Sequence, residues 1–173
     1  IIEISKIFSK EKPNALVLFG DRYDMFVGIS AIPFNIPIIH LYGGAVTEGA
    51  IDEQIRHSIT KISHLHLVAN ENYYKRVVQM GEEKWRVKII GVPELKYLLE
   101  QPIMSINKLS NEMKIDISKP TLLSTFHPET LNIHKTIKNF KVMLNAIKKS
   151  NLQVIFTYPN ADFKNSKIIK ILK

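Results

Sequence analysis

Short apolar runs alternate with amphipathic stretches along the whole 173-residue chain. This alternation constrains the fold more than any other feature, because it is typical of a parallel β-sheet whose strands are joined by crossover helices. We therefore predict an α/β fold with parallel sheets. The apolar runs, each interpreted as a buried strand, are residues 15–19, 37–41, 65–69, 87–90, 121–126 and 152–158.

Between these runs, apolar residues recur at every third or fourth position, which predicts helices with one buried face. Asn70 is expected to cap one such helix, which would run to Met80 and stop at Gly81. The two clearest apolar series are Ile51, Ile55, Ile59 and Ile62, and Ile133, Ile137, Phe140, Leu144 and Ile147.

Residues 101–119 interrupt the rhythm, because they carry no strand signal and end directly before Pro120. We interpret them as a linker, with a helix around residues 106–113, between one domain at residues 1–100 and another at residues 120–173. The first recognisable element is a helix that leads into a strand, and the last is a lysine-rich helix that no strand follows. We therefore expect an internal piece, truncated at both ends, of a longer protein.

The composition excludes several classes of protein. Hydrophobic residues make up 45% and charged residues 23%, and no apolar segment reaches the ~18 residues of a membrane span, so we expect a soluble protein without a membrane partner. The absence of cysteine excludes disulfides and thiolate metal sites and is compatible with a cytoplasmic location.

The chain is basic, with a formal net charge of +8. Much of the excess lies in lysines of the last third, which are spread around helical patterns without interleaved aromatic residues. Solvated helix faces explain this pattern better than attraction of an anionic ligand, and both explain it better than binding of nucleic acid. We expect no nucleic acid partner.

Polar and charged side chains gather where the predicted strands end. Ligands of open α/β sheets bind at the carboxyl ends of the strands, so these residues are candidates for a site. Asp52 and Arg56 lie four positions apart and therefore on one face of a predicted helix. The candidates are Asp21 and Arg22 after the first strand, Gly43, Gly44 and Glu48 after the second, Asp52 and Arg56 on the next helix, His127 after the fifth strand and Asn160 after the sixth.

Several of these residues also have a simpler interpretation. Asp21 can cap the helix that follows it, and Asp52 and Arg56 can form a surface ion pair. His127 precedes a proline, as hydrogen-bonded turn residues often do. Because these residues lie together at strand ends, a functional site and the simpler interpretations are about equally well supported.

Three histidines that lie close in sequence, His57, His64 and His66, raise the question of a metal site. His57 falls in a predicted helix, whereas His64 and His66 flank the start of a strand, so the spacing does not match a zinc site. The chain also contains no Walker-type loop, GxGxxG, GxSxG or zincin motif. We expect no metal and no cofactor.

Five segments carry a resemblance to a known family, in the order GDRYDM, NIPIIHLYGG, VTEGAIDEQIRHSITKISHLH, FHPET and FTYPNADF. They resemble the hydrolysing UDP-N-acetylglucosamine 2-epimerases of bacterial sialic acid, legionaminic acid and capsule pathways. The resemblance implies a GT-B-like fold, with parts of two Rossmann-like parallel-sheet domains. Residues 1–100 would be the C-terminal part of the first domain and residues 120–173 the N-terminal part of the second.

The resemblance also implies a reaction, in which UDP is eliminated across C1 and C2 of a UDP-sugar and the resulting glycal is hydrated to an N-acetylmannosamine-type sugar. By motif, the catalytic residues would be Asp21, Asp52 and His127, with Glu48 as a nearby substitute carboxylate. Contacts to the UDP-sugar would come from Arg22, Arg56, Asn160, Gly43 and Gly44. A homo-oligomer is implied for the full-length protein.

The chain departs from the family pattern at Tyr42 and Ala45, because a carboxylate is usual at one of these two positions. Pro33 falls in the last predicted turn of the helix after GDRYDM, which it must end or kink. Segments that contact the diphosphate and uridine in the family are not matched. Two alternatives therefore stay open, namely a non-catalytic UDP-sugar-binding remnant and a fragment of a GT-B glycosyltransferase. The identity of the sugar is open as well.

Overall fold

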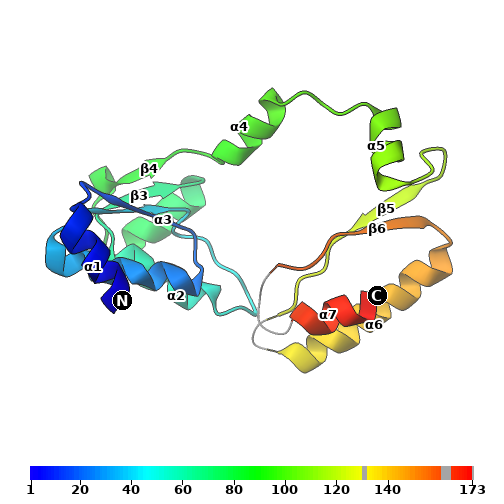
Figure 1. The fold of residues 1–173 in the computed structure, drawn as a ribbon. Coiled ribbons are helices and arrows are strands. Elements are labelled where there is room, and N and C mark those ends of the chain that lie inside the picture. The colour runs from blue at the N-terminus through cyan, green and yellow to red at the C-terminus, as the bar shows by residue number, and fades with distance from the viewer. Residues whose placement is uncertain (130–131, 161–164, 173) are drawn as a thin grey trace. The chain divides into compact units, whose positions relative to one another are not determined.

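A computed structural model describes residues 1–129, 132–160 and 165–172 (Figure 1). Thr130, Ala161 and Asp162, which follow predicted strands, lie outside the described residues. The chain divides into two compact units, Ile1–Glu100 and Gln101–Lys173, called unit 1 and unit 2 below. Among the described residues, no helix is long and apolar enough to cross a membrane.

Unit 1 is built around a four-stranded parallel sheet in the order β1-β2-β3-β4. Neighbours in the sheet are also successive strands in the chain, so each crossover moves one position along the sheet. The α/β prediction is confirmed. The elements of unit 1 are α1 (Ile2–Glu11), β1 (Leu16–Phe19), η1 (Tyr23–Phe34), β2 (Ile38–Leu41), α2 (Asp52–Ile62), β3 (Leu65–Val68), α3 (Glu71–Gln79), η2 (Lys84–Arg86), β4 (Val87–Ile89) and α4 (Pro93–Glu100).

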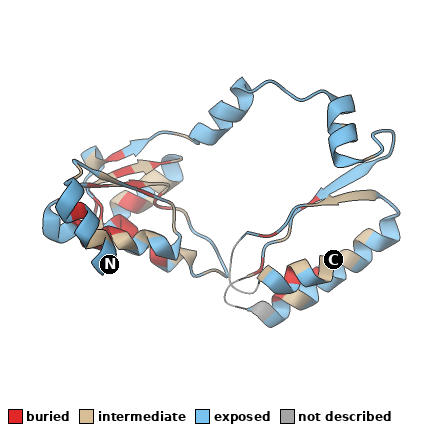
Figure 2. Cartoon of the chain, in the orientation of Figure 1, coloured by how far each residue is buried: buried red, intermediate tan, exposed pale blue. Residues whose placement is uncertain are grey.

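One face of this sheet forms the core. Leu18, His40, His66 and Val87 are paired across the four strands, so they share a face, and all four are buried. Figure 2 shows the buried residues of unit 1 on the strands and on the helices that pack against them. Ile55 and Ile59 of α2 join this core, which confirms the helical period expected around them.

The opposite face corrects one prediction. Val17 and Phe19 of β1 are 56% and 52% exposed, so the prediction of a buried strand is wrong for this face of β1. The physical reason is that successive side chains of a strand point to opposite faces, and α1, η1 and α2 pack on the face of Leu18.

Local signals placed several helix ends correctly. The side chain of Asn70 accepts a hydrogen bond from the Tyr73 amide at 3.1 Å, and Gly81 follows α3 with a φ of 97°. Pro33 lies in the last turn of η1, which ends at Phe34. Helix α4 was not predicted, although its proline at the first helical position is a typical start signal.

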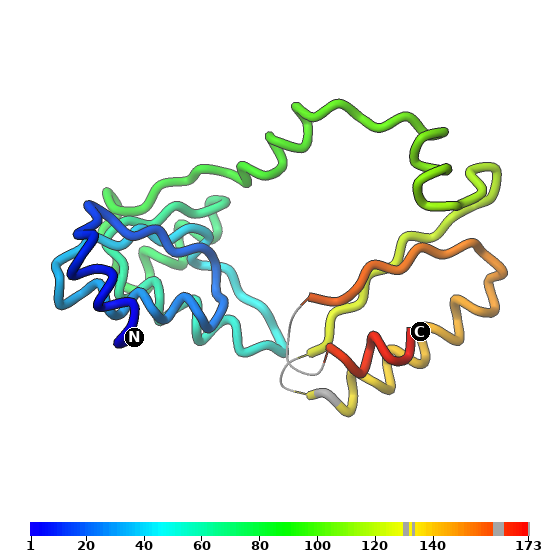
Figure 3. The backbone as a smooth tube through the Cα atoms, in the orientation of Figure 1, coloured from blue at the N-terminus to red at the C-terminus, as the bar shows by residue number. Residues whose placement is uncertain are grey.

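Unit 2 contains a two-stranded parallel sheet, β5-β6, with Ser124 opposite Phe156 at its carboxyl end. Phe140 and Ile168 are fully buried, and the Phe126 ring lies 4.8 Å from the Phe140 ring. Figure 3 traces the chain through this unit, where α7 packs beside α6. Its elements are α5 (Ile106–Met113), β5 (Thr121–Ser124), α6 (Ile133–Ser150), β6 (Gln153–Phe156) and α7 (Asn165–Leu172).

Candidate functional site

Arg56 organises the carboxyl edge of the sheet in unit 1. Its side chain is only 5% exposed, because α2 packs its face against the sheet. The guanidinium donates from Nη2 to the Asp21 carboxylate and to Thr47 Oγ1, the latter at 3.1 Å, and from Nη1 to the Ala45 carbonyl oxygen at 2.7 Å. One buried cation therefore joins α2, the loop after β1 and the loop after β2.

This geometry does not match the simpler interpretation of Asp21 as a helix cap. Asp21 does not cap η1, whose N-cap is Arg22, but faces Arg56 with its side chain 28% exposed. Arg56 is buried and donates to Asp21, so it is not a surface residue. Asp52 is the first residue of α2, one turn before Arg56. A carboxylate held by a buried guanidinium is kept in one orientation.

His40 lies beneath this edge, in the middle of the core face. Its Nε2 is 2.8 Å from the Gly20 carbonyl oxygen, and its Nδ1 is 3.1 Å from Thr60 Oγ1. Burial is the main cause that lowers the pKa of His40 to about 4, with smaller contributions from His66 and Arg56. His40 is therefore neutral near pH 7.

The two glycines after β2 allow close backbone packing. A Cβ on Gly43 would lie 3.0 Å from His40 Nδ1, and a Cβ on Gly44 would lie 2.5 Å from the Tyr73 carbonyl oxygen. Gly44 also has a φ of 84°, which favours glycine. Arg76 of α3 donates to the Gly44 carbonyl oxygen, so both neighbouring helices hold this loop.

Tyr42 occupies one of the two positions at which the resemblance to the family implies a carboxylate. Its backbone has a φ of 65°, its ring packs edge-to-face with Phe19 at 5.1 Å, and its hydroxyl donates to the Glu94 carboxylate on α4. Burial first, and then this hydrogen bond, raise the pKa of Tyr42 to about 12. The bond lowers the pKa of Glu94. The contact places an ionised carboxylate beside Tyr42.

The remaining candidates of unit 1 lie at the surface. Glu48 is exposed in the loop between β2 and α2. Arg22 is also exposed, and its Nε is 3.2 Å from Asp24 Oδ1. Both residues follow the strands at the same edge as Asp21.

In unit 2, the carboxyl ends of β5 and β6 bring His127 and Asn160 together. The Asn160 amide donates to His127 Nδ1 at 3.2 Å, and the Asn160 carbonyl oxygen accepts from Asn165 Nδ2 at 2.9 Å. His127 is exposed. The accepting Nδ1 leaves its Nε2 as the protonated nitrogen of the neutral ring.

The three clustered histidines are separated by the fold. His57 lies on α2, His64 Nδ1 accepts from the Ile38 amide at 3.1 Å, and His66 is buried in β3 with its Nε2 3.2 Å from Glu82 Oε2. In the described part of the chain, no group of three or more potential ligands is placed to hold a metal ion.

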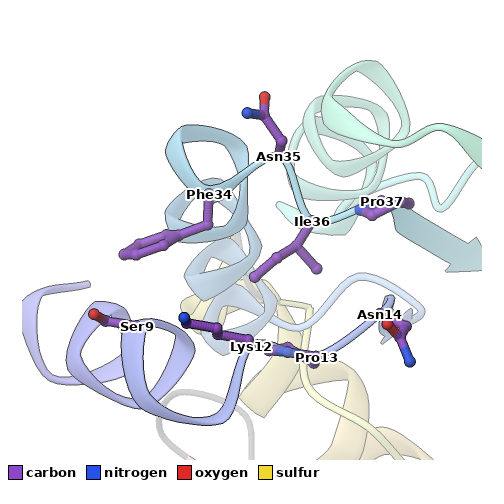
Figure 4. A pocket seen from close by; sticks show the side chains of 8 residues that line it. All are labelled: Ser9, Lys12, Pro13, Asn14, Phe34, Asn35, Ile36 and Pro37. Carbon is purple, nitrogen blue, oxygen red and sulfur yellow. The ribbon is translucent and has the colours of Figure 1, made fainter.

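A hollow of about 440 Å³ in unit 1 lies at the other end of the sheet, beside the residues that precede β1 and β2. Figure 4 shows Lys12 and Phe34 on its wall, with Asn14 and Asn35 nearby. None of the candidate residues lines this hollow, so it is separate from the carboxyl edge of the sheet, where the candidates lie.

Sequence reasoning missed His40, Thr60, Arg76 and Glu94. His40 and Thr60 lie inside an apolar strand and an apolar helix face, where a polar residue without an apparent partner is the available signal. Arg76 and Glu94 lie on helices far along the chain from the loops that they contact, and no local pattern predicts such contacts.

The chain matches the family profile described as UDP-N-acetylglucosamine 2-epimerase over residues 1–173. It is 40% identical over 171 residues to GDP/UDP-N,N'-diacetylbacillosamine 2-epimerase (hydrolyzing) of Campylobacter jejuni, covering 98% of this chain and 44% of the relative. It is 32% identical over 163 residues to UDP-N,N'-diacetylbacillosamine 2-epimerase (hydrolyzing) of Legionella pneumophila, covering 94% and 43%. The chain thus spans less than half the length of these relatives.

The fold is similar to that of solved epimerases. The structure of UDP-GlcNAc 2-epimerase from Neisseria meningitidis bound to UDP-GlcNAc aligns with a TM-score of 0.79 at 19% identity, covering 99% of this chain and 49% of that one. The fold is therefore that of half of a GT-B-like epimerase, as expected. Because the family profile covers all of its residues, the chain belongs to the UDP-N-acetylglucosamine 2-epimerase family rather than to the glycosyltransferases that share its architecture.

Proposed function

We propose that this chain carries part of the UDP-sugar site of a hydrolysing 2-epimerase, which releases UDP and an N-acetylmannosamine-type sugar. The observation that carries the proposal is the Asp21–Arg56 pair at the carboxyl edge of the unit 1 sheet. The family supports it, because relatives named as hydrolysing 2-epimerases match nearly the whole chain.

The reaction has two steps. In the first, a carboxylate takes the proton from C2 of the sugar, the C–H electron pair forms the C1=C2 double bond, and the C1–O electron pair leaves with UDP. In the second, water adds its oxygen to C1 and a proton adds to C2 from the opposite face. UDP-sugar and water thus become UDP and the 2-epimer.

Asp21 and Asp52 are the carboxylates proposed for proton transfer, with Glu48 as a third. Arg56 already uses its buried guanidinium inside the chain, so we assign it to holding Asp21 and the 45–47 loop rather than to a first contact with the diphosphate. Arg22, which is exposed, is the better candidate for the diphosphate.

In unit 2, His127 and Asn160 are proposed to act on the leaving oxygen and on the sugar. The two residues are joined, because the backbone amide of Asn160 donates to His127 Nδ1. We further propose that residues 1–100 and 120–173 belong to two successive Rossmann-like domains, joined by residues 101–119. A cytoplasmic location and assembly of the whole protein as a homo-oligomer complete the proposal.

A second candidate is a UDP-sugar-binding module without catalysis. Ala45 carries no carboxylate, and its carbonyl oxygen is used by Arg56. Tyr42 offers a phenol whose pKa of about 12 keeps it protonated at neutral pH. These two positions favour binding over turnover.

The test is incubation of the purified chain in D₂O with UDP-GlcNAc or with UDP-N,N'-diacetylbacillosamine. Phosphorus NMR detects UDP, and proton NMR detects deuterium at C2 of the free sugar. UDP together with C2-deuterated sugar supports the hydrolysing epimerase, and Asp21→Asn should abolish both signals. UDP-sugar binding by calorimetry without release of UDP supports the module, and a folded chain that does neither contradicts both functions.

A further inference from the structure

His40 connects the segments of unit 1 that carry the candidate residues. It is 0% exposed and lies on β2. Its Nε2 faces the Gly20 carbonyl oxygen at 2.8 Å, directly before Asp21. Its Nδ1 faces Thr60 Oγ1 at 3.1 Å, and that hydroxyl lies 3.0 Å from the Arg56 carbonyl oxygen. Thr60 lies on α2, so two hydrogen bonds of His40, to Gly20 and to Thr60, join the Asp21 loop to α2.

The acceptors in these hydrogen bonds determine where the protons lie. The Gly20 carbonyl oxygen only accepts, so Nε2 of His40 carries the hydrogen. The ring is neutral near pH 7, so Nδ1 can only accept. The Thr60 hydroxyl has a single, rotatable hydrogen, which therefore points to Nδ1 rather than to the Arg56 carbonyl oxygen. The Nδ1-protonated tautomer would leave two buried acceptors, Nε2 and the Gly20 carbonyl oxygen, facing each other.

The loop after β2, which contains Gly43, also contacts His40 and Thr60. A Cβ at this position would lie 3.0 Å from His40 Nδ1 and 3.1 Å from Thr60 Oγ1. The loop after β2 therefore lies directly on the His40–Thr60 pair, and a side chain at position 43 would push against both.

We propose that His40 is a positioning residue, which sets the Asp21 loop through its Nε2–H and the helix of Asp52 and Arg56 through Thr60. The effect on UDP-sugar chemistry rests on the proposed function. The anchoring itself does not, because it concerns only contacts within the chain.

Two substitutions of similar polarity distinguish the role of His40 Nε2 from that of Nδ1. Gln at position 40 places an amide N–H where Nε2 lies, whereas Asn reaches only the position of Nδ1. His40→Gln should keep kcat within a few-fold of wild type, and His40→Asn should lower kcat by up to about 100-fold with KM little changed, as expected when a reacting group is misplaced. Thr60→Ser should retain activity and Thr60→Val should lose part of it.

Circular dichroism establishes that each variant is folded. A folded His40→Asn variant with the kcat of wild type would overturn the proposal, and so would equal losses in the Gln and Asn variants. A general loss of packing would change both variants alike, so rescue by Gln identifies the hydrogen bond to Gly20.

Nitrogen-15 NMR of the wild-type chain supplies a readout without substrate. We expect a neutral His40 with its proton on Nε2, and Asp21 and Arg22 amide signals that shift in the Asn variant but not in the Gln variant. Protonation on Nδ1, or unshifted signals in the Asn variant, would contradict the anchoring. A folded wild-type chain that neither binds nor hydrolyses a UDP-sugar would instead contradict the proposed function, whatever the NMR result.

Discussion

Arg56 on α2 and Asp21 after β1 form an ion pair across 35 positions of sequence, with the arginine side chain almost fully buried. Replacing Arg56 by Lys keeps the charge but loses the fork of donors that also reaches Ala45 and Thr47. We expect the free energy of unfolding to fall by roughly 1.5–3 kcal/mol. Urea denaturation measures it.

The matched control is Arg22→Lys, because the Arg22 side chain is 62% exposed. That change should alter stability by less than about 0.5 kcal/mol. Equal effects at positions 22 and 56 would show that Arg56 does not hold the loop.

The buried imidazole of His40 makes stability depend on pH. Its pKa is about 4 in the folded chain against the ordinary 6.5, so the unfolded chain binds the proton first. Protonation of His40 in the unfolded chain therefore has no effect on the free energy of unfolding above pH 6.5. As the pH falls from 6.5 towards 4, it lowers the free energy of unfolding by roughly 3 kcal/mol in all. The charged and titratable groups around it are His66 and Arg56, which lower the pKa, and Asp21, which raises it.

Urea denaturation at about pH 7, 6 and 5 measures this slope. His57 and His66, whose pKa values burial also lowers, add slopes of the same sign. His40→Gln should make the free energy of unfolding depend less on pH, by the contribution of one titrating group. An unchanged slope in that variant would contradict a buried, neutral His40.

Substitution of Gly44 and of Gly20 by Ala tests the close packing of the loop after β2, because only the surroundings of the two glycines differ. Both have positive φ, 84° and 71°, but a Cβ on Gly44 would lie 2.5 Å from the Tyr73 carbonyl oxygen, whereas nothing lies within 4 Å of one on Gly20. Gly20→Ala should cost about 1–2 kcal/mol from backbone conformation alone. Gly44→Ala should cost roughly 2–5 kcal/mol, because overpacking against a backbone atom adds to it. Thermal denaturation of the two variants tests the difference, and equal losses would be inconsistent with the close contact to α3.

The hydrogen bond from Tyr42 to Glu94 should be visible by spectrophotometric titration. Tyr42 has a pKa of about 12, raised by burial and by Glu94. In Glu94→Gln, the Tyr42 component should titrate at lower pH by absorbance near 295 nm, and in Tyr42→Phe it should disappear. Tyr97, exposed on the same helix, provides the control substitution. A titration unchanged in the Gln variant would rule out the contact.

Glu82 supports the buried His66 and accepts from Lys61 at 2.5 Å. Burial alone would raise the pKa of Glu82, but Lys61 and His66 outweigh it and lower the pKa. Its contribution to stability is therefore present above about pH 4.5 and is lost as pH falls below it. Glu82→Ala should cost roughly 1–3 kcal/mol at neutral pH. Lys61→Ala, at a half-exposed position, should cost less than about 1 kcal/mol.

The six described strands, most of the helices and the edge that carries the candidate residues could be predicted from the amino-acid sequence, whereas α4 was not predicted. Strand and helix periods are local properties of the chain, and the Asn70 cap and the end of η1 beyond Pro33 depend on neighbours within a few residues. The carboxyl-end rule then placed Asp21 after β1 and His127 and Asn160 together after β5 and β6, because parallel strands end at one edge.

The partner of each side chain follows from the packing of the elements and could not be predicted from the sequence. Arg56 meets Asp21, His40 meets Gly20 and Thr60, and Tyr42 meets Glu94 at a separation of 52 positions. These contacts depend on strand register and helix packing, which bring together residues with no shared local pattern. The same packing decided that Val17 and Phe19 lie on an exposed face, since an apolar run does not reveal which of its sides a helix will cover.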